Sequence, residues 1–87
     1  MDITITGKNM EVSDYLKGLV DKKAGKLKKY FKPNTAVHVT LSIEKSRHIA
    51  EVTIPFDGIV MRGEVAGTDM YAAIDGALSK IEHQIMK

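Results

Sequence analysis

Residues 36–66 read AVHVTLSIEKSRHIAEVTIPFDGIVMRGEVA, and apolar and polar side chains alternate through most of this segment. A two-residue period is typical of β-strands that bury one face. Lys45-Ser46-Arg47 predicts one turn, and Asp57-Gly58 is a strong signal for a two-residue hairpin turn. The segment therefore predicts three consecutive antiparallel strands. Their inward-facing residues are predicted to be Val37, Val39, Leu41 and Ile43, then Ala50, Val52, Ile54 and Phe56, then Ile59, Met61, Gly63 and Val65.

The sequence on either side of this segment predicts one more strand and two helices. Residues 2–6 alternate isoleucine with threonine, which indicates a short half-buried strand. A helix is predicted from its N-cap, Ser13, to Phe31, before Pro33-Asn34 ends it. A second helix is predicted with Thr68 as its N-cap. Apolar residues recur every three or four positions in both helices, namely Leu16, Leu19, Val20, Ala24, Leu27, Tyr30 and Phe31, then Met70, Ile74, Ala77, Leu78, Ile81 and Ile85.

The predicted element order is β-α-β-β-β-α. A helix between the first two strands favours a right-handed crossover, so these strands are expected to run parallel. Each strand has one polar face, so both helices are expected to cover the other face of the sheet. The sequence thus predicts an α+β fold in two layers, a four-stranded mixed sheet with two parallel helices packed on one face. Eighty-seven residues suffice for a single domain.

Composition excludes several kinds of chemistry. The chain has no cysteine, which removes disulfides, thiolate catalysis and cysteine-ligated metals. The first residues contain no apolar run of signal-peptide length, and no stretch approaches the roughly 18 apolar residues of a membrane span. We therefore expect a cytoplasmic protein. No pair of carboxylates is arranged for acid–base work, so the chain is not expected to be an enzyme.

Lysines are concentrated in the first predicted helix. Between Lys17 and Lys32 the chain has seven lysines and one acid, among thirteen basic residues in total. On a wheel of about 100° per residue, one flank beside the apolar stripe is purely basic. This flank carries Lys22, Lys23, Lys26 and Lys29. The opposite flank is mixed, and Lys17 and Asp21 can pair there at i,i+4.

The second predicted helix has the same arrangement. Its basic flank carries Lys80, His83, Gln84 and Lys87, and Asp75 and Glu82 fall on the opposite side. Two helices with bases on corresponding flanks suggest a band of donors that matches a phosphate backbone. The alternative is that these lysines are the ordinary solvated charges of surface helices.

Other polar residues give weaker signals. His38 and His48 could lie near one another on adjacent strands, but no third metal ligand is evident, so no metal site is expected. Gly76 is interpreted as a tolerated surface glycine, with close approach to RNA as the alternative. Tyr71 could stack on a base or pack over the edge of the sheet, and the sequence leaves both open.

The segment Gly67-Thr68-Asp69-Met70-Tyr71-Ala72-Ala73-Ile74-Asp75 resembles the ribosome hibernation promoting factor family, which includes ribosome-associated inhibitor proteins. Further matching residues occur along the whole chain, in the expected order. They are Ile5-Thr6-Gly7, Asn9, Lys26-Leu27, Tyr30-Phe31, Lys80 and Gln84. The resemblance implies the β-α-β-β-β-α fold and a translation inhibitor without a cofactor. Such a domain binds the small ribosomal subunit and its rRNA in the decoding channel, where it blocks messenger and transfer RNA.

Carried over by position, the resemblance assigns RNA contacts to Lys23, Lys26, Lys80, Gln84 and Lys87. Several family members have arginine where this chain has a histidine at position 83, and neutral histidine lacks that charge. The alternative is a regulatory protein-binding module, because relatives also carry the label of sigma-factor modulators. Long family members add a C-terminal dimerisation domain. We therefore expect residues 1–87 to be the ribosome-binding, N-terminal domain of a longer protein, with a minimal short form of the family as the alternative. The isolated domain is expected to be monomeric, and the resemblance to long members suggests a dimer at full length.

Overall fold

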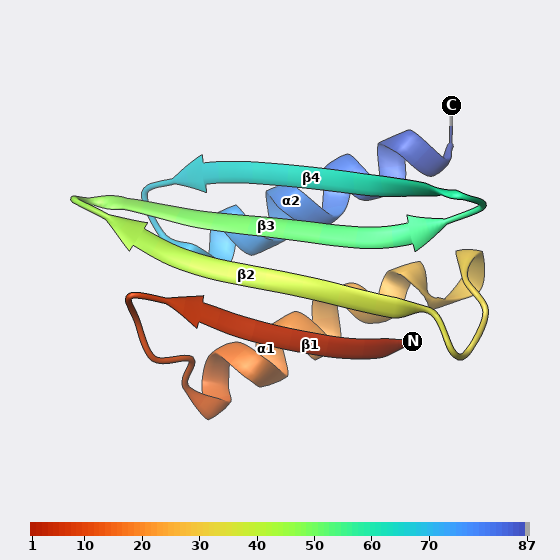
Figure 1. Cartoon of the computed structure of the whole chain (residues 1–87). Coiled ribbons are helices and arrows are strands. Elements are labelled where there is room, and N and C mark those ends of the chain that lie inside the picture. Colours follow the sequence, from red (N-terminus) through yellow and green to blue (C-terminus); the bar gives the residue numbers. More distant parts are fainter. Residues whose placement is uncertain (87) are drawn as a thin grey trace.

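Four strands form one sheet in a computed structural model that describes residues 1–86. They lie side by side in sequence order, as Figure 1 shows, and are β1 (Asp2–Lys8), β2 (Ala36–Glu44), β3 (Arg47–Phe56) and β4 (Ile59–Gly67). β1 pairs parallel with β2, and the other two pairings are antiparallel. The predicted mixed sheet and element order are confirmed.

The two hairpin turns use backbone conformations with positive φ. Asp57 has φ 55° and Gly58 has φ 81°, as the two central residues of a type I′ turn require. This confirms the predicted hairpin. In the other turn Lys45 has φ 57°, and Arg47 already begins β3 instead of belonging to the turn.

The helices begin at polar caps and lie on one face of the sheet (Figure 1). α1 (Asp14–Ala24) begins after Ser13, whose hydroxyl accepts from the Leu16 amide at 3.2 Å, as predicted. α2 (Met70–Ile85) begins after Asp69, so the prediction of Thr68 as its cap is wrong. The Asp69 carboxylate accepts from the amide three residues later at 2.8 Å and satisfies a free helix donor.

The prediction of one regular helix through Phe31 is also wrong. The chain changes at Gly25 to a 3₁₀ helix, η1 (Gly25–Tyr30). Ala24 and Leu27 are fully buried and Tyr30 is half-buried. Their spacing of three residues fits a helix with three residues per turn, which keeps all of them over the core.

The core fills the space between the inner sheet face and the helices. Val39, Val52 and Leu78 have no exposed surface. Three residues predicted to face inward remain exposed because they lie at strand ends, namely Ile43 (41%), Phe56 (38%) and Ile59 (63%). Strands of nine or ten residues extend about 30 Å, whereas the 16 residues of α2 extend about 24 Å. α2 is therefore too short to cover the sheet from end to end.

Two glycines allow α2 to pack closely on β4. A Cβ atom at Gly63 would lie 2.6 Å from the Ala77 carbonyl oxygen, which is an impossible contact. A Cβ atom at Gly76 would lie 3.2 Å from both methyl groups of Val65. Gly76 thus faces the sheet, and its interpretation as a tolerated surface glycine is wrong.

No helix within residues 1–86 combines the length and apolar character that crossing a membrane requires.

Candidate nucleic-acid interface

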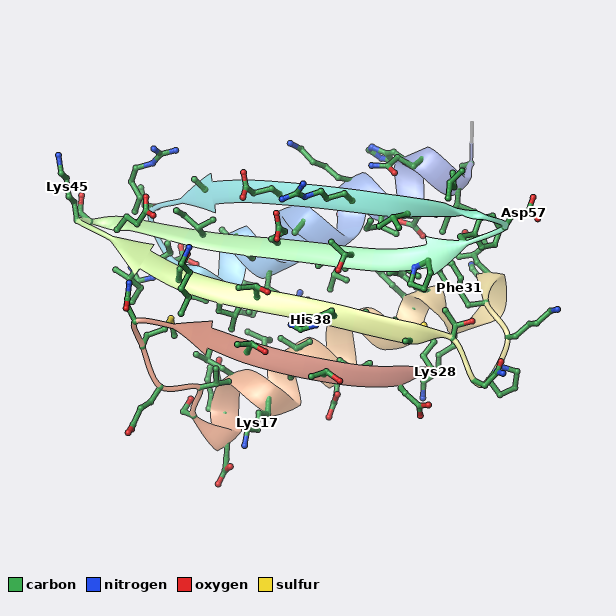
Figure 2. All side chains as sticks on the ribbon, in the orientation of Figure 1. Lys17, Lys28, Phe31, His38, Lys45 and Asp57 are labelled. Atoms are coloured by element: carbon green, nitrogen blue, oxygen red, sulfur yellow. The ribbon has the colours of Figure 1, made fainter. Side chains whose placement is uncertain are left out.

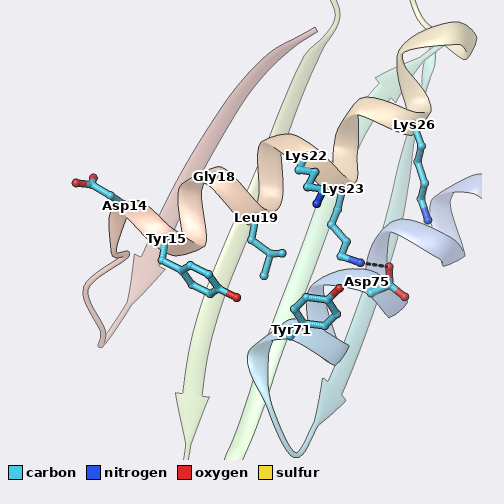
Figure 3. Close-up of a pocket in the computed structure, with 9 residues that line it drawn as sticks. All are labelled: Asp14, Tyr15, Gly18, Leu19, Lys22, Lys23, Lys26, Tyr71 and Asp75. Carbon is cyan, nitrogen blue, oxygen red and sulfur yellow. Dashed lines mark ion pairs between the residues drawn. The ribbon is translucent and has the colours of Figure 1, made fainter.

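The basic flank of α1 faces α2 across a groove. This groove has a volume of about 610 Å³ and lies between the two helices (Figure 3). Lys22, Lys23 and Lys26 line it, so three of the four lysines predicted on this flank come together. The other lining residues are Asp14, Tyr15, Gly18, Leu19, Tyr71 and Asp75.

Lys23 joins the two helices. Its ammonium lies 3.2 Å from a carboxylate oxygen of Asp75 and 4.3 Å from the centroid of the Tyr71 ring. The Tyr71 side chain first, and Asp75 after it, raise the pKa of Lys23 above the ordinary lysine value by stabilising its charged form. The positive charge of Lys23 is therefore largely compensated within the domain, by Asp75 and the Tyr71 ring. Because Tyr71 contacts Lys23 between the helices, its alternative placement over the sheet edge is wrong.

Lys22 and Lys26, unlike Lys23, have no charged partner in the described part of the chain. Both are exposed, and within residues 1–86 neither forms an ion pair. They are therefore cations free to meet an external anion. Lys29 is exposed too, but it lies outside the groove, with its ammonium 5.2 Å from the centroid of the Tyr30 ring. Lys29 follows Lys26 by three residues in η1, so the two share one side of this 3₁₀ helix and Lys29 lies one turn, roughly 6 Å, farther along its axis.

The basic flank of α2 lies elsewhere, at the free edge of β4. The Lys80 ammonium donates to the Glu64 carbonyl oxygen at 2.9 Å, and the Gln84 amide donates to the Arg62 carbonyl oxygen at 2.7 Å. Both side chains thus satisfy acceptors of an edge strand, a structural role that protects such an edge. The body of α2 separates this flank from the groove. The predicted band on corresponding flanks is therefore two separate basic regions.

The remaining predicted contacts divide in the same way. His83 is exposed on α2, and within residues 1–86 its side chain forms no hydrogen bond or ion pair. Lys87 lies outside the described residues. Asp75, predicted on the flank away from the bases, faces the basic flank of the neighbouring helix. The Lys17–Asp21 pair is not among the ion pairs formed in the described part of the chain.

One residue of the groove was missed from sequence. Tyr15 is 71% exposed, and its side chain extends from α1 into the groove (Figure 3). It falls at about 260° on the wheel that has Leu16 at zero, close to Lys22. This position already indicated that Tyr15 lies on the basic flank. The wheel could not show that this flank would face a second tyrosine on α2.

The histidines do not come together. His38 pairs with Thr53, whereas His48 pairs with Ile43, so the two histidines lie five positions apart along β2. His38 instead lies 3.1 Å from the Thr6 hydroxyl on the outer face of the sheet, where Figure 2 shows it. The prediction that the two could be neighbours is wrong. No group of three metal-binding side chains occurs among residues 1–86.

Comparison with known proteins identifies the family. A family model described as sigma 54 modulation protein / S30EA ribosomal protein matches residues 3–87. The chain belongs to this family. The S30EA match covers nearly the whole chain, and it confirms the relationship that residues 67–75 predicted.

Individual proteins similar to this chain agree with this assignment. The ribosome hibernation promoting factor of Salmonella typhimurium is 38% identical over 87 residues, which cover 100% of this chain and 92% of that protein. The ribosome hibernation promotion factor of Bacillus subtilis is 40% identical over 90 aligned residues, which cover 100% of this chain but 48% of that protein. The N-terminal domain of Thermus thermophilus Protein Y has a TM-score of 0.88 at 32% identity, covering 98% of this chain and 96% of that one.

Proposed function

We propose that this domain is a ribosome hibernation factor that binds the small ribosomal subunit in its decoding channel and blocks messenger and transfer RNA. The observation that carries the proposal is the alignment of the whole chain with proteins named ribosome hibernation promoting factor, at 38% identity. The function is one of binding alone, without a reaction or a cofactor. The free cations on the helical layer support an RNA partner.

The contact surface in this proposal is the helical layer. Lys22 and Lys26 supply unpaired positive charge in the groove, and Lys29 adds a third exposed cation at the end of η1. Lys80 uses one of its three ammonium hydrogens on β4, so two donors remain for phosphate oxygens. His83, Gln84 and Lys87 complete the proposed surface. Phosphate contacts of this kind supply affinity and register without reading sequence.

The proposed inhibition is steric. The Cα trace of the domain spans 36 × 25 × 19 Å, so a bound domain excludes other macromolecules from a comparable volume. A domain in the decoding channel would therefore compete with transfer RNA by occupying its space. Inhibition should saturate near one domain per ribosome and require neither nucleotide nor metal.

Co-sedimentation with isolated small subunits tests the binding step. We expect the wild-type domain to pellet with the subunits and to be displaced progressively by added salt. The logarithm of the affinity should fall by about 0.7–0.9 per phosphate contact for each unit of log salt. Absence of binding at low salt would reject the proposal.

Competition with transfer RNA tests the mechanism. We expect the domain and transfer RNA to lower each other's affinity for the small subunit, and the domain to inhibit cell-free translation. Simultaneous binding without mutual loss of affinity would refute the steric mechanism and leave a ribosome-binding role at another site.

A second candidate is a regulatory protein-binding module, which the sigma 54 part of the family description favours. It predicts salt-insensitive binding to a sigma factor and no binding to bare subunits. The same co-sedimentation assay, repeated with purified sigma 54 factor in place of subunits, distinguishes the two candidates.

A further inference from the structure

We propose that the groove between α1 and α2 binds one unpaired nucleotide of RNA, with its base against Tyr15 and Tyr71 and its phosphate at Lys22 and Lys26. This inference rests on the proposed RNA-binding function and names the ligand that the groove accepts. The groove volume of about 610 Å³ falls within the range of small-ligand sites, roughly 300–1,000 Å³.

The aromatic side chains supply the first argument. Tyr15 and Tyr71 are 71% and 51% exposed, although tyrosine gains from burying its ring. They reach the groove from different helices, with Leu19 beside them (Figure 3). Exposed aromatic rings in a basic groove are the usual platform for unstacked bases. A paired base in a duplex cannot present its face in this way.

Lys23 keeps one of these rings in position. Its ammonium lies 4.3 Å from the Tyr71 centroid and is held at 3.2 Å by Asp75. A cation over one face of the ring fixes its orientation and leaves half of its surface exposed. Lys23 is therefore a positioning residue in this proposal. Its charge is engaged by the protein, so it is not the phosphate ligand.

The remaining charges give the groove a direction. Lys22 and Lys26 lie toward the end of α1 and into η1, and neither is paired within residues 1–86. Asp14 lies at the opposite end, in the first turn of α1 (Figure 3). A phosphate is attracted to the lysine end and repelled from the aspartate end. The nucleotide phosphate is therefore assigned to Lys22 and Lys26, and the base to the end lined by Tyr15.

The test compares a short oligoadenylate with an abasic oligonucleotide of the same length and charge. Fluorescently labelled probes allow both affinities to be measured by anisotropy. We expect the wild-type domain to bind oligoadenylate about tenfold more tightly than the abasic probe, the usual scale of one base stacked on an aromatic side chain. Equal affinities would overturn the proposal.

Two double variants locate the base preference. Tyr15→Leu with Tyr71→Leu should remove the tenfold preference and retain the affinity for the abasic probe. Tyr15→Phe with Tyr71→Phe preserves both rings and should retain the preference. A preference that persists in the folded leucine variant would overturn the groove as its source. If the leucine variant fails to fold, the phenylalanine variant and the abasic comparison still decide the proposal.

Tyrosine fluorescence gives an independent measurement. The chain has no tryptophan and three tyrosines, of which two line the groove. Oligoadenylate should therefore quench the intrinsic emission of the wild-type domain more than the abasic probe does. Small-subunit binding is then measured for the same variants. A wild-type domain that binds subunits but shows no base preference rejects only this proposal, whereas a wild-type domain that does not bind subunits rejects the proposed function.

Discussion

The basic flanks of the two helices have similar compositions and different surroundings. Lys22 on α1 and Lys26 on η1 line an open groove and form no ion pair within residues 1–86. On α2, Lys80 and Gln84 donate to carbonyl oxygens of the edge strand β4. One flank has charge available for a partner, and the other is partly used by the fold. Residue type alone therefore does not distinguish a binding lysine from a structural one.

The glycines of the two regions show the same contrast. Gly63 on β4 and Gly76 on α2 permit a close contact between sheet and helix. Gly18 on α1 has no atom within 4 Å of the place its Cβ would take, although it lines the groove. The α2 side is closely packed, whereas the α1 side opens into the groove.

The largest expected effect is the loss of binding in Lys22→Glu with Lys26→Glu. Both residues are exposed, so the fold should persist, and two reversed charges should weaken small-subunit binding by about 100-fold or more. Co-sedimentation measures the binding, and circular dichroism checks the fold.

The matched control is Lys17→Glu with Lys28→Glu. These lysines project at the β1 side of the molecule, away from the groove (Figure 2). The control should bind nearly as the wild type does. An equal loss in both variants would show that net charge, and not the groove, governs the affinity.

Gly63→Ala should give the largest loss of stability. The new methyl group would lie 2.6 Å from the Ala77 carbonyl oxygen and would push α2 away from β4. We expect the free energy of unfolding to fall by about 2 kcal/mol, which lowers the melting temperature by about 10 °C.

Gly18→Ala is the comparison for that variant. Its methyl group meets open space in the middle of a helix, so stability should rise by about 0.5–1 kcal/mol. Thermal unfolding followed by circular dichroism measures both variants. Equal responses would contradict the difference in packing between the two regions.

Lys80→Ala should act mainly on stability, and Lys22→Ala mainly on binding. Removing Lys80 leaves the Glu64 carbonyl without its 2.9 Å donor, at a cost of about 0.5–1 kcal/mol in unfolding free energy. Removing Lys22 breaks no contact of this kind. Chemical denaturation and co-sedimentation of both variants separate the two roles, and an unchanged unfolding midpoint in Lys80→Ala would refute the structural role.

The smallest effect concerns Lys23 at alkaline pH. Its pKa is raised above the ordinary value of 10.5 by Tyr71 and then Asp75. The stabilisation from this raised pKa is fully present below pH 10.5 and is lost as pH rises through the folded-state value. The free energy of unfolding of Lys23→Met should therefore differ most from that of the wild type at neutral pH and least at strongly alkaline pH. A difference that grows with pH would contradict the contact.

Local patterns allowed most of the fold to be predicted. The alternation in residues 36–66 and the Asp57-Gly58 turn predicted three strands that the structure confirms. The helix boundaries were less accurate. The Asp69 cap and the change to η1 at Gly25 depend on which residue reaches the free amides and on the spacing of buried residues.

The candidate site was predicted in part. The wheel grouped Lys22, Lys23 and Lys26 on one flank, and all three line the groove. The wheel gives directions around a helix but not how far along its axis the groove extends, and Lys29, one 3₁₀ turn after Lys26, does not line it. Tyr15 was overlooked, since an exposed aromatic residue has no significance until its neighbours are known.

Local patterns were enough to predict the order of the elements and the buried face of each strand, because periodicity and turn residues act locally, and residues 67–75 indicated the family. What each basic flank meets depends on the tertiary structure. The order β1-β2-β3-β4 places α1 and α2 side by side, so the flank of α1 faces Tyr71 and Asp75 while that of α2 lies along β4. The helical period predicts which side chains share a flank of one helix. Which flank lies beside another helix depends on contacts between residues distant in sequence.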